Sequence, residues 1–461
     1  MSHVKTLARK DIVLFTVSAI LLLDTLAASA TIGPASIFWW LFLGVVFFLP
    51  YALICAEMGT TYPEQGGLYA WIRDAFGRRW ASRATWAYWV NTAVWMPAVF
   101  ILFAGIFAQI FNPDMSMGAR IALSILLTWV AVGINVITLD IGKWIPNLGA
   151  LFKILIIGAI IVGAINYTLE NGMANPLTIK SMTPAWGDSL QYFSVIIYGM
   201  LGFELVSAGS EEMQDPARDV PSSILISGLI IIVLYVAATA SILAAIPVDE
   251  IDLVEGLVDT LYLLFGGTAL GNAFALLLGI GALYTFFANN VTWSLGCNRA
   301  MAQAAREREF PRVLGRTHAR LGTPTGAAFI MGLASTAALL LYGLLAGSNE
   351  ELFWSLFAFS AVIFLIPYIV LVFAFVKMRY IDGDRHRPFR VPGGNPVATL
   401  LAIVCALLLA LALLLFLYTP GSGVRWPVCI GAVTVLAVGE IIIRATEKSR
   451  GPDAAATTGG A

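Results

Sequence analysis

The chain has 461 residues, of which 59% are hydrophobic and 12% are charged, and its formal net charge is −1. A soluble globular domain carries roughly twice this charged fraction, about 25%. The composition therefore excludes an ordinary soluble protein. Because apolar segments recur from Ile12 to Ile443 with no soluble-sized gap, we expect one integral membrane domain over residues 1–461.

Segments of about 20 mostly apolar residues, the length that crosses a bilayer as a helix, recur along the whole chain. We expect twelve spans, at about 12–33, 36–57, 83–111, 118–139, 146–167, 189–211, 221–246, 265–298, 325–346, 352–377, 396–418 and 425–445. The first contains Asp24 and lacks a clean small-residue cleavage site, so we interpret it as a retained helix and not as a signal peptide. The eighth is too long for one span and is expected to continue as a helix into the next loop.

The distribution of basic residues predicts the orientation, because cytoplasmic loops are enriched in Lys and Arg. With the N-terminus in the cytoplasm, 23 of the 27 Lys and Arg residues fall on the cytoplasmic side. The outer loop 248–260 is instead acidic. The sequence therefore predicts a multi-pass protein of the cell membrane with both termini in the cytoplasm.

Two cytoplasmic loops are expected to be more than connectors. Residues 59–82 alternate aromatic and charged side chains, which predicts a short helix on or tucked into the cytoplasmic face. Residues 299–324 contain six Arg and suggest a basic helix at the lipid surface. The tail 450–461 is of low complexity and is expected to be disordered. The four Cys residues lie in or beside apolar segments, so we expect free thiols.

Lys153 is the most informative single residue, because it lies alone inside the apolar stretch 148–163. A lysine at membrane depth costs at least a few kcal/mol, about 2.5–3.5 on insertion scales. Such a residue usually faces a polar cavity or a transport pathway. Its ammonium is expected to act either as a protonation switch or as a permanent charged strut.

Two acidic residues also fall inside predicted spans. Asp24 lies about twelve residues into the first span, where it could be a counter-charge for a substrate amino group, a cap on a helix start or an ion partner of Lys153. Glu204 lies in the middle of the sixth span, where it could exchange a proton or hold helices together by a hydrogen bond.

Other classes of site are not supported. The sequence has no nucleotide motif, no metal-ligand spacing and no nucleophile constellation, so we expect no enzyme activity, no cofactor and no metal. The basic loops follow the positive-inside pattern and do not indicate nucleic-acid binding. We expect the partners to be the bilayer and a small molecule.

Four stretches carry a family resemblance. They are Glu57-Met58 with 63–71, Gly202-Phe203-Glu204 with 212–221, Asn298-Arg299 to 324, and Arg387-Pro388-Phe389-Arg390-Val391-Pro392-Gly393-Gly394. In this order they resemble the amino acid–polyamine–organocation transporter superfamily. The first helix and the Glu57-Met58 region resemble its glutamate/GABA antiporter branch most.

The resemblance implies an all-α, LeuT-like fold of two inverted five-helix repeats, about 11–167 and 189–378, followed by two further helices at about 396–445. The first helix of each repeat is then broken at the midplane, and its half-helix ends offer unpaired N–H and C=O groups to the substrate. The glycines of 198–202 support the second break, although glycine there could equally serve close helix packing. The first break, expected at 23–30, lacks the glycines that help relatives to hold a carboxylate.

The resemblance also implies the residues of a midplane substrate pocket. The implied set is Asp24, Thr25, Ala28, Ser29, Tyr198, Gly199, Gly202, Asn289 and Trp293. Tyr198 and Trp293 resemble aromatic positions that gate and contact substrate in the arginine/agmatine antiporter, although membrane aromatics are often simply packing residues. Lys153 and Glu204 are the implied coupling residues. Lys153 resembles a lysine whose ammonium occupies the place of a sodium ion in sodium-coupled relatives, which argues against sodium coupling there.

The sequence therefore predicts a secondary transporter that moves an amino acid or a related amine by alternating access, with protons as the candidate coupling ion. A polyamine or diamine transporter is the alternative, and a channel is the remote one. An ionised Asp24 would favour diamines and polyamines, whereas a protonated one is compatible with amino acids, which family frequency places ahead. The exact substrate, exchange against symport, and the oligomeric state stay open.

Overall fold

The computed structural model describes residues 9–63, 67–137, 144–184, 193–206, 216–252, 256–419 and 423–449. This part of the chain is helical, apart from turns and a hairpin of β1 (Tyr418–Thr419) and β2 (Gly423–Val424). The expected all-α class is confirmed. The tail 450–461, the loop motif 212–215 and the side chain of Asp24 lie outside the described residues.

Ten helices in the described ranges are long and apolar enough to cross a bilayer. One is a continuous helix made of α3 (Ala35–Leu43), the π-helical η1 (Gly44–Phe48) and α4 (Leu49–Thr61). The others are α6 (Arg78–Phe111), α7 (Met117–Ile137), α8 (Trp144–Asn171), α11 (Pro216–Ala245), α13 (Ala269–Arg306), α14 (Thr325–Gly343), α15 (Asn349–Ile381), α16 (Gly394–Leu417) and α17 (Trp426–Ser449). The expected helical extension of the eighth span is present, since α13 continues to Arg306.

The two remaining predicted spans are interrupted helices. The first consists of α1 (Arg9–Ile20) and α2 (Asp24–Ala30), separated by three non-helical leucines at 21–23. This break precedes most of the stretch 23–30 where it was expected, because residues 24–30 are helical. In the sixth span, α10 (Phe193–Tyr198) is followed by turns and a 3₁₀ segment at 203–206, as the glycines predict.

The cytoplasmic-loop predictions had different outcomes. Loop 59–82 contains the predicted short helix, α5 (Leu68–Phe76), which turns into α6 at Gly77 with a φ of 86° that favours glycine. The expected basic surface helix at 299–324 is wrong, because helix α13 ends at Arg306 and turns follow. Glu309 accepts a hydrogen bond from Ser82 at 2.7 Å, so the start of this segment folds back onto α6.

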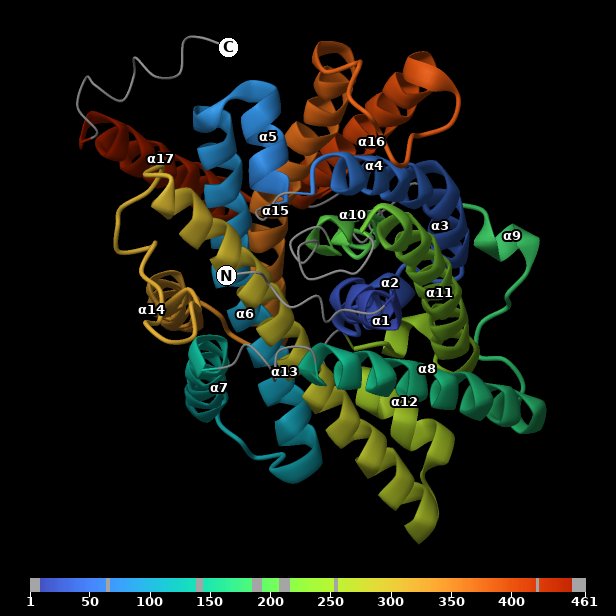
Figure 1. Cartoon of the computed structure of the whole chain (residues 1–461). Helices are drawn as coiled ribbons and strands as arrows, with labels where there is room; N and C mark the ends of the chain where they lie inside the picture. Colours follow the sequence, from blue (N-terminus) through green and yellow to red (C-terminus); the bar gives the residue numbers. More distant parts are fainter. Residues whose placement is uncertain are drawn as a thin grey trace.

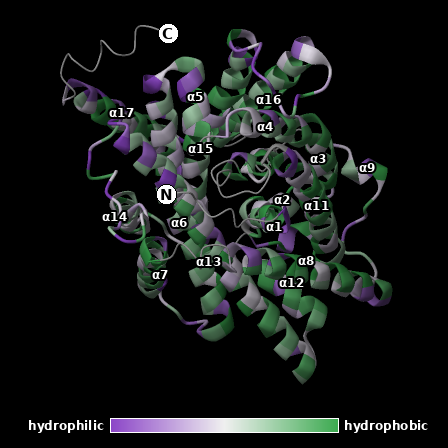
Figure 2. Cartoon of the chain, viewed as in Figure 1, coloured by the Kyte–Doolittle hydropathy of each residue, from purple (hydrophilic) through white to green (hydrophobic). Residues whose placement is uncertain are grey.

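Figure 1 shows α1, α2 and α10 in the middle of the bundle, surrounded by the long helices. Shorter elements, α9 (Ile179–Met182), η5 (Val248–Glu250) and α12 (Gly256–Phe265), lie between them in the chain. Figure 2 shows that the long helices are mostly hydrophobic. Large apolar residues on them, such as Leu126 and Leu229, are exposed. Such a surface suits a lipid environment. The interrupted helices lie inside the bundle, where their non-helical backbone is shielded from lipid.

Two of the motif segments meet in one buried ion-pair cluster. The carboxylate of Glu57, at the end of α4, accepts two hydrogen bonds from Arg379 of α15, at 2.8 and 2.7 Å. It also accepts the backbone N–H of Val391 at 2.7 Å, and a nitrogen of Arg387 lies 3.4 Å from it. The cluster ties the end of α4 to the segment between α15 and α16.

Candidate substrate site

The carbonyl end of α1 is capped by three side chains from three helices. Lys153 of α8 donates to the carbonyl of Ser18 at 2.6 Å. Trp293 of α13 donates its indole N–H to the next carbonyl, Ala19, at 3.0 Å. A hydroxyl of α11 donates to the third, Ile20, at 2.8 Å. Because a helix leaves its last carbonyls without intrahelical partners, these donors stabilise the broken end inside the protein.

That hydroxyl belongs to Tyr235, which bridges the two helix breaks. Besides donating to Ile20, it accepts the backbone N–H of Leu22 at 2.7 Å and lies 3.3 Å from the carbonyl oxygen of Gly199. Its ring is stacked on Trp40 with the centroids 4.0 Å apart. The expectation that the first break offers unpaired backbone groups is therefore corrected for these atoms, because side chains have already bound them.

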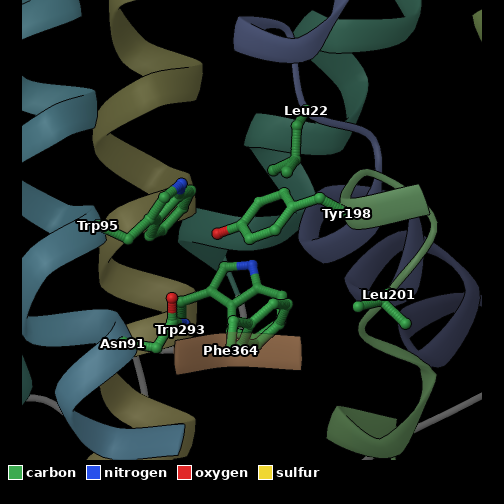
Figure 3. A pocket seen from close by; sticks show the side chains of 7 residues that line it. All are labelled: Leu22, Asn91, Trp95, Tyr198, Leu201, Trp293 and Phe364. Carbon is green, nitrogen blue, oxygen red and sulfur yellow. The ribbon is translucent and has the colours of Figure 1, made fainter. Parts of the chain in front are cut away.

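A small cavity lies beside both breaks (Figure 3). It is lined by Leu22, Asn91, Trp95, Tyr198, Leu201, Trp293 and Phe364. These residues come from the two interrupted spans and from α6, α13 and α15. The volume of the cavity is about 10 Å³, roughly the space of one water molecule, so the side chains of the wall would have to move apart to admit an organic ligand.

The cavity wall is mainly aromatic. Tyr198 packs against Phe364 with the ring centroids 5.0 Å apart, and Trp293 packs against Phe364 at 5.4 Å and Trp95 at 6.1 Å. None of the described lining residues carries a charge. Two buried polar atoms of the lining residues, Asn91 Oδ1 and Trp95 Nε1, have no hydrogen-bond partner within the described part of the chain. Such orphaned atoms are costly to leave unpaired and suit a polar ligand.

The structure brings two of the predicted contact residues, Tyr198 and Trp293, into the cavity wall. Thr25 and Ser29 donate to carbonyls of their own segment, and neither they nor Ala28 lines the cavity. Their role as substrate contacts stays a prediction.

The other predicted contacts also lie outside the cavity lining. Gly199 and Gly202 shape the second break, and a Cβ at Gly202 would lie 3.0 Å from Ile20 and 3.2 Å from Trp293, which explains the glycine. Asn289 accepts from Lys153 at 3.3 Å instead of facing the cavity. These three residues therefore shape the surroundings of the cavity and do not line it.

Sequence reasoning missed Leu22, Asn91, Trp95, Leu201 and Phe364. Leu201 lies within the predicted break 198–202 but was not named as a contact, and Leu22 directly precedes the predicted stretch 23–30. Asn91 could have been noticed in the sequence, because it carries a polar amide in the middle of a long apolar helix, where polar side chains need partners. Trp95 and Phe364 had none, since aromatic residues are common in these spans.

Lys153, a predicted coupling residue, is buried with an exposed fraction of 1%. Its ammonium contacts the end of α1 through Ser18 and the middle of α13 through Asn289. The structure thus places the charge between the first break and a neighbouring long helix. An ion pair with Asp24 lies outside the described residues.

Glu204, the second predicted coupling residue, lies in a cluster of tyrosine hydroxyls. Its carboxylate accepts from Tyr51 at 2.7 Å, Tyr88 at 3.0 Å and Tyr368 at 2.6 Å, from three helices. The ring of Tyr368 lies 4.6 Å from that of Phe364, measured between centroids. The cluster therefore packs against the cavity wall through Phe364 and joins three helices by hydrogen bonds to a single carboxylate.

Comparison with known proteins is consistent with this architecture. A family model described as amino acid permease matches residues 7–438. A probable agmatine/putrescine antiporter of Lactococcus lactis subsp. lactis is 33% identical, over 94% of this chain and 93% of its own. A glutamate/gamma-aminobutyrate antiporter from the same organism is 24% identical, over 88% and 82% of the two chains. The polyamine transporter PUT1 of Oryza sativa subsp. japonica is 24% identical, over 81% and 68%.

Over the whole chain, the agmatine/putrescine antiporter is more similar than the glutamate/gamma-aminobutyrate antiporter, whose branch the first helix and Glu57-Met58 had suggested. The family match covers nearly the whole described chain, including both interrupted helices and the cavity between them. The chain belongs to the amino acid permease family of the amino acid–polyamine–organocation superfamily, and it is a multi-pass membrane transporter, not an enzyme.

Proposed function

We propose that this transporter carries small organic amines of the agmatine and putrescine class across the cell membrane, by exchange and alternating access. The observation that carries the proposal is the aromatic cavity between the two helix breaks. An ammonium or guanidinium group gains attraction from aromatic faces, and the gain is larger in a desolvated site. Asn91 Oδ1 adds an acceptor without adding charge.

The same wall is poorly suited to a free carboxylate. A buried carboxylate needs charge-assisted donors or a counter-ion, and the described lining offers no charged side chain and only neutral donors such as Trp95 Nε1. This reverses the order that family frequency gave, in which amino acids came first. The relatives named for agmatine, putrescine and polyamines support the same order.

We also propose the finer architecture that the sequence implies. Adding the interrupted helices α1–α2 and α10 with its 3₁₀ segment to the ten long helices gives twelve spans. Grouping them as inverted repeats of 11–167 and 189–378, with α16 and α17 outside, makes each repeat begin with an interrupted helix. An even number of spans would put both termini on one side, and the distribution of Lys and Arg would make that side the cytoplasm. Such a fold moves by rocking one bundle about a fixed midplane site.

Proton coupling is proposed at Lys153 and Glu204. Lys153 holds the carbonyl end of α1, so loss of its proton would weaken a contact to the first break. Glu204 accepts three tyrosine hydroxyls, so a proton there would replace one acceptor position by a donor. Either change alters how tightly the helices around the cavity are held.

Binding to the purified protein in detergent tests the site. Tyr198→Ala and Trp293→Ala should each weaken binding of labelled putrescine or agmatine by about tenfold or more, because each removes an aromatic face of a desolvated cavity. Asn91→Leu should weaken it as well, because the acceptor is lost. Phe373→Ala, an exposed ring of α15 outside the lining, is the matched control and should bind normally.

Thermal melting without ligand would show whether each variant is folded. If both aromatic variants fold and bind the amines as tightly as the unmodified protein, the cavity is not the substrate site. If the unmodified protein binds neither amine, the proposed substrate class is wrong.

A further inference from the structure

Tyr235 has a geometry that bears on which amines the site accepts. Its hydroxyl is held between the two helix breaks, and the ring is fully buried and stacked on Trp40. It accepts the N–H of Leu22, a residue whose side chain lines the cavity. A side chain from α11 therefore occupies a backbone donor at the edge of the site.

Broken helices in transporters commonly use such backbone N–H groups to hold an anionic substrate group. Here the Leu22 N–H donates to a neutral hydroxyl at 2.7 Å, which is a short, well-formed bond. The same hydroxyl donates to the Ile20 carbonyl at 2.8 Å, so it also occupies one acceptor position at the end of α1. One backbone donor and one backbone acceptor at the first break are therefore paired within the protein.

We propose that Tyr235 is a specificity-determining residue that makes the site discriminate against substrates with an α-carboxylate. This inference rests on the proposed amine transport and names the determinant of that substrate class. A carboxylate entering the cavity would have to displace the hydroxyl from Leu22, or stay without that donor. An amine without a carboxylate does not need the Leu22 N–H and can use the aromatic wall and Asn91.

Matched ligand pairs that differ only by the carboxylate test this directly. Arginine and agmatine form one pair, and ornithine and putrescine form the other. For the purified unmodified protein, each amine should bind more tightly than its parent amino acid. Tyr235→Phe keeps the ring against Trp40 but frees the Leu22 N–H and the Ile20 carbonyl.

In Tyr235→Phe, the ratio of the arginine to the agmatine dissociation constant should fall about tenfold or more, which is the effect of one hydrogen bond to a charged group. Thr239→Val is the control, since it removes a buried hydroxyl one turn along the same helix, where the oxygen lies 3.4 Å from Ser29 Oγ and not at the break. Its ratio should not change.

The outcomes separate the two proposals. If agmatine binds and Tyr235→Phe leaves both ratios unchanged, the role of Tyr235 is refuted while amine transport stands. If the unmodified protein binds each amino acid as tightly as its amine, the role of Tyr235 is refuted without any need for a folded variant. If no amine binds at all, the proposed function fails and this inference fails with it.

Discussion

At the scale of single residues, Lys153 links the first helix break to the rest of the bundle. Its charge in an apolar segment was visible in the sequence, and the structure adds its partners, the carbonyl of Ser18 and the amide oxygen of Asn289. Three consecutive carbonyls of α1 receive donors from three helices, and Lys153 provides the one that can change its charge. It is thus the residue at which pH could act on the break.

We expect Lys153→Ala to insert and fold, since removal of an intramembrane charge makes the span more apolar. Transport of labelled putrescine into liposomes should lose or flatten its pH dependence, because the ammonium that contacts Ser18 is gone. Sodium dependence should not appear, because no new oxygen ligands are created. Lys377→Ala removes a lysine that packs on Phe76, away from the break, and is the control.

An unchanged pH profile in Lys153→Ala would make Lys153 a structural residue. The proton site would then be sought at Glu204, the buried carboxylate of the tyrosine cluster next to the cavity. The two roles are separable because their hydrogen-bond partners are different residues.

The residues that sequence reasoning found and missed differ in a physical way. Lys153 and Glu204 were identifiable because a charge in an apolar span is costly. Tyr198 and Trp293 were identified through the family resemblance. Tyr235 could not be, because a tyrosine in an apolar span is ordinary, and its bond to Leu22 joins residues 213 positions apart.

At the scale of elements, the two interrupted helices could be anticipated, but their geometry could not. Glycines predict the second break, where Gly202 has a φ of 131°. The first break has three leucines and no glycine, so its position depends on side chains of α8, α11 and α13 that cap the carbonyls. Tertiary contacts of this kind leave no local pattern in the sequence.

The tyrosine cluster around Glu204 gives an element-scale prediction. Glu204→Gln keeps the shape of the side chain but leaves one oxygen to accept three hydroxyls, so the contacts of α4, α6 and α15 should weaken. Cys297 is buried, and its sulfur lies 3.8 Å from the carbonyl oxygen of Tyr88, which makes it a native reporter. Labelling of Cys297 by N-ethylmaleimide should therefore become several times faster.

Cys405 is the internal control for this labelling. It is also buried, but its sulfur lies by the carbonyl of Phe47 and has no hydrogen bond to the cluster. Equal rates for Cys297 in the unmodified protein and in Glu204→Gln, measured by mass spectrometry of the labelled peptides, would show that the cluster does not hold these helices closed.

At the scale of the whole molecule, the sequence predicted the helix positions well, because hydrophobic length is a direct requirement of the bilayer. Each of the ten long helices overlaps a predicted span. The segment after α13 was predicted wrongly, because its Arg content suggested a lipid-facing helix whereas Glu309 and Phe310 are buried. Composition alone does not show that a basic segment folds back onto the protein.

Orientation can be tested on the same scale with introduced cysteines. With Cys429 replaced by Ser, Asp249→Cys should react with a membrane-impermeant maleimide in intact cells, because the acidic loop is expected outside. Arg312→Cys should react only after permeabilisation. Labelling of the second variant alone in intact cells would reverse the predicted orientation.

The most direct test of amine exchange through the cavity is uptake of labelled putrescine into liposomes that contain the purified protein. We expect saturable uptake that is accelerated by putrescine or agmatine inside the liposomes and is inhibited far more by external agmatine than by arginine. Trp293→Ala should abolish the acceleration. Non-saturable uptake that is indifferent to internal amine would indicate a channel, and equal inhibition by arginine and agmatine would contradict an amine-selective site.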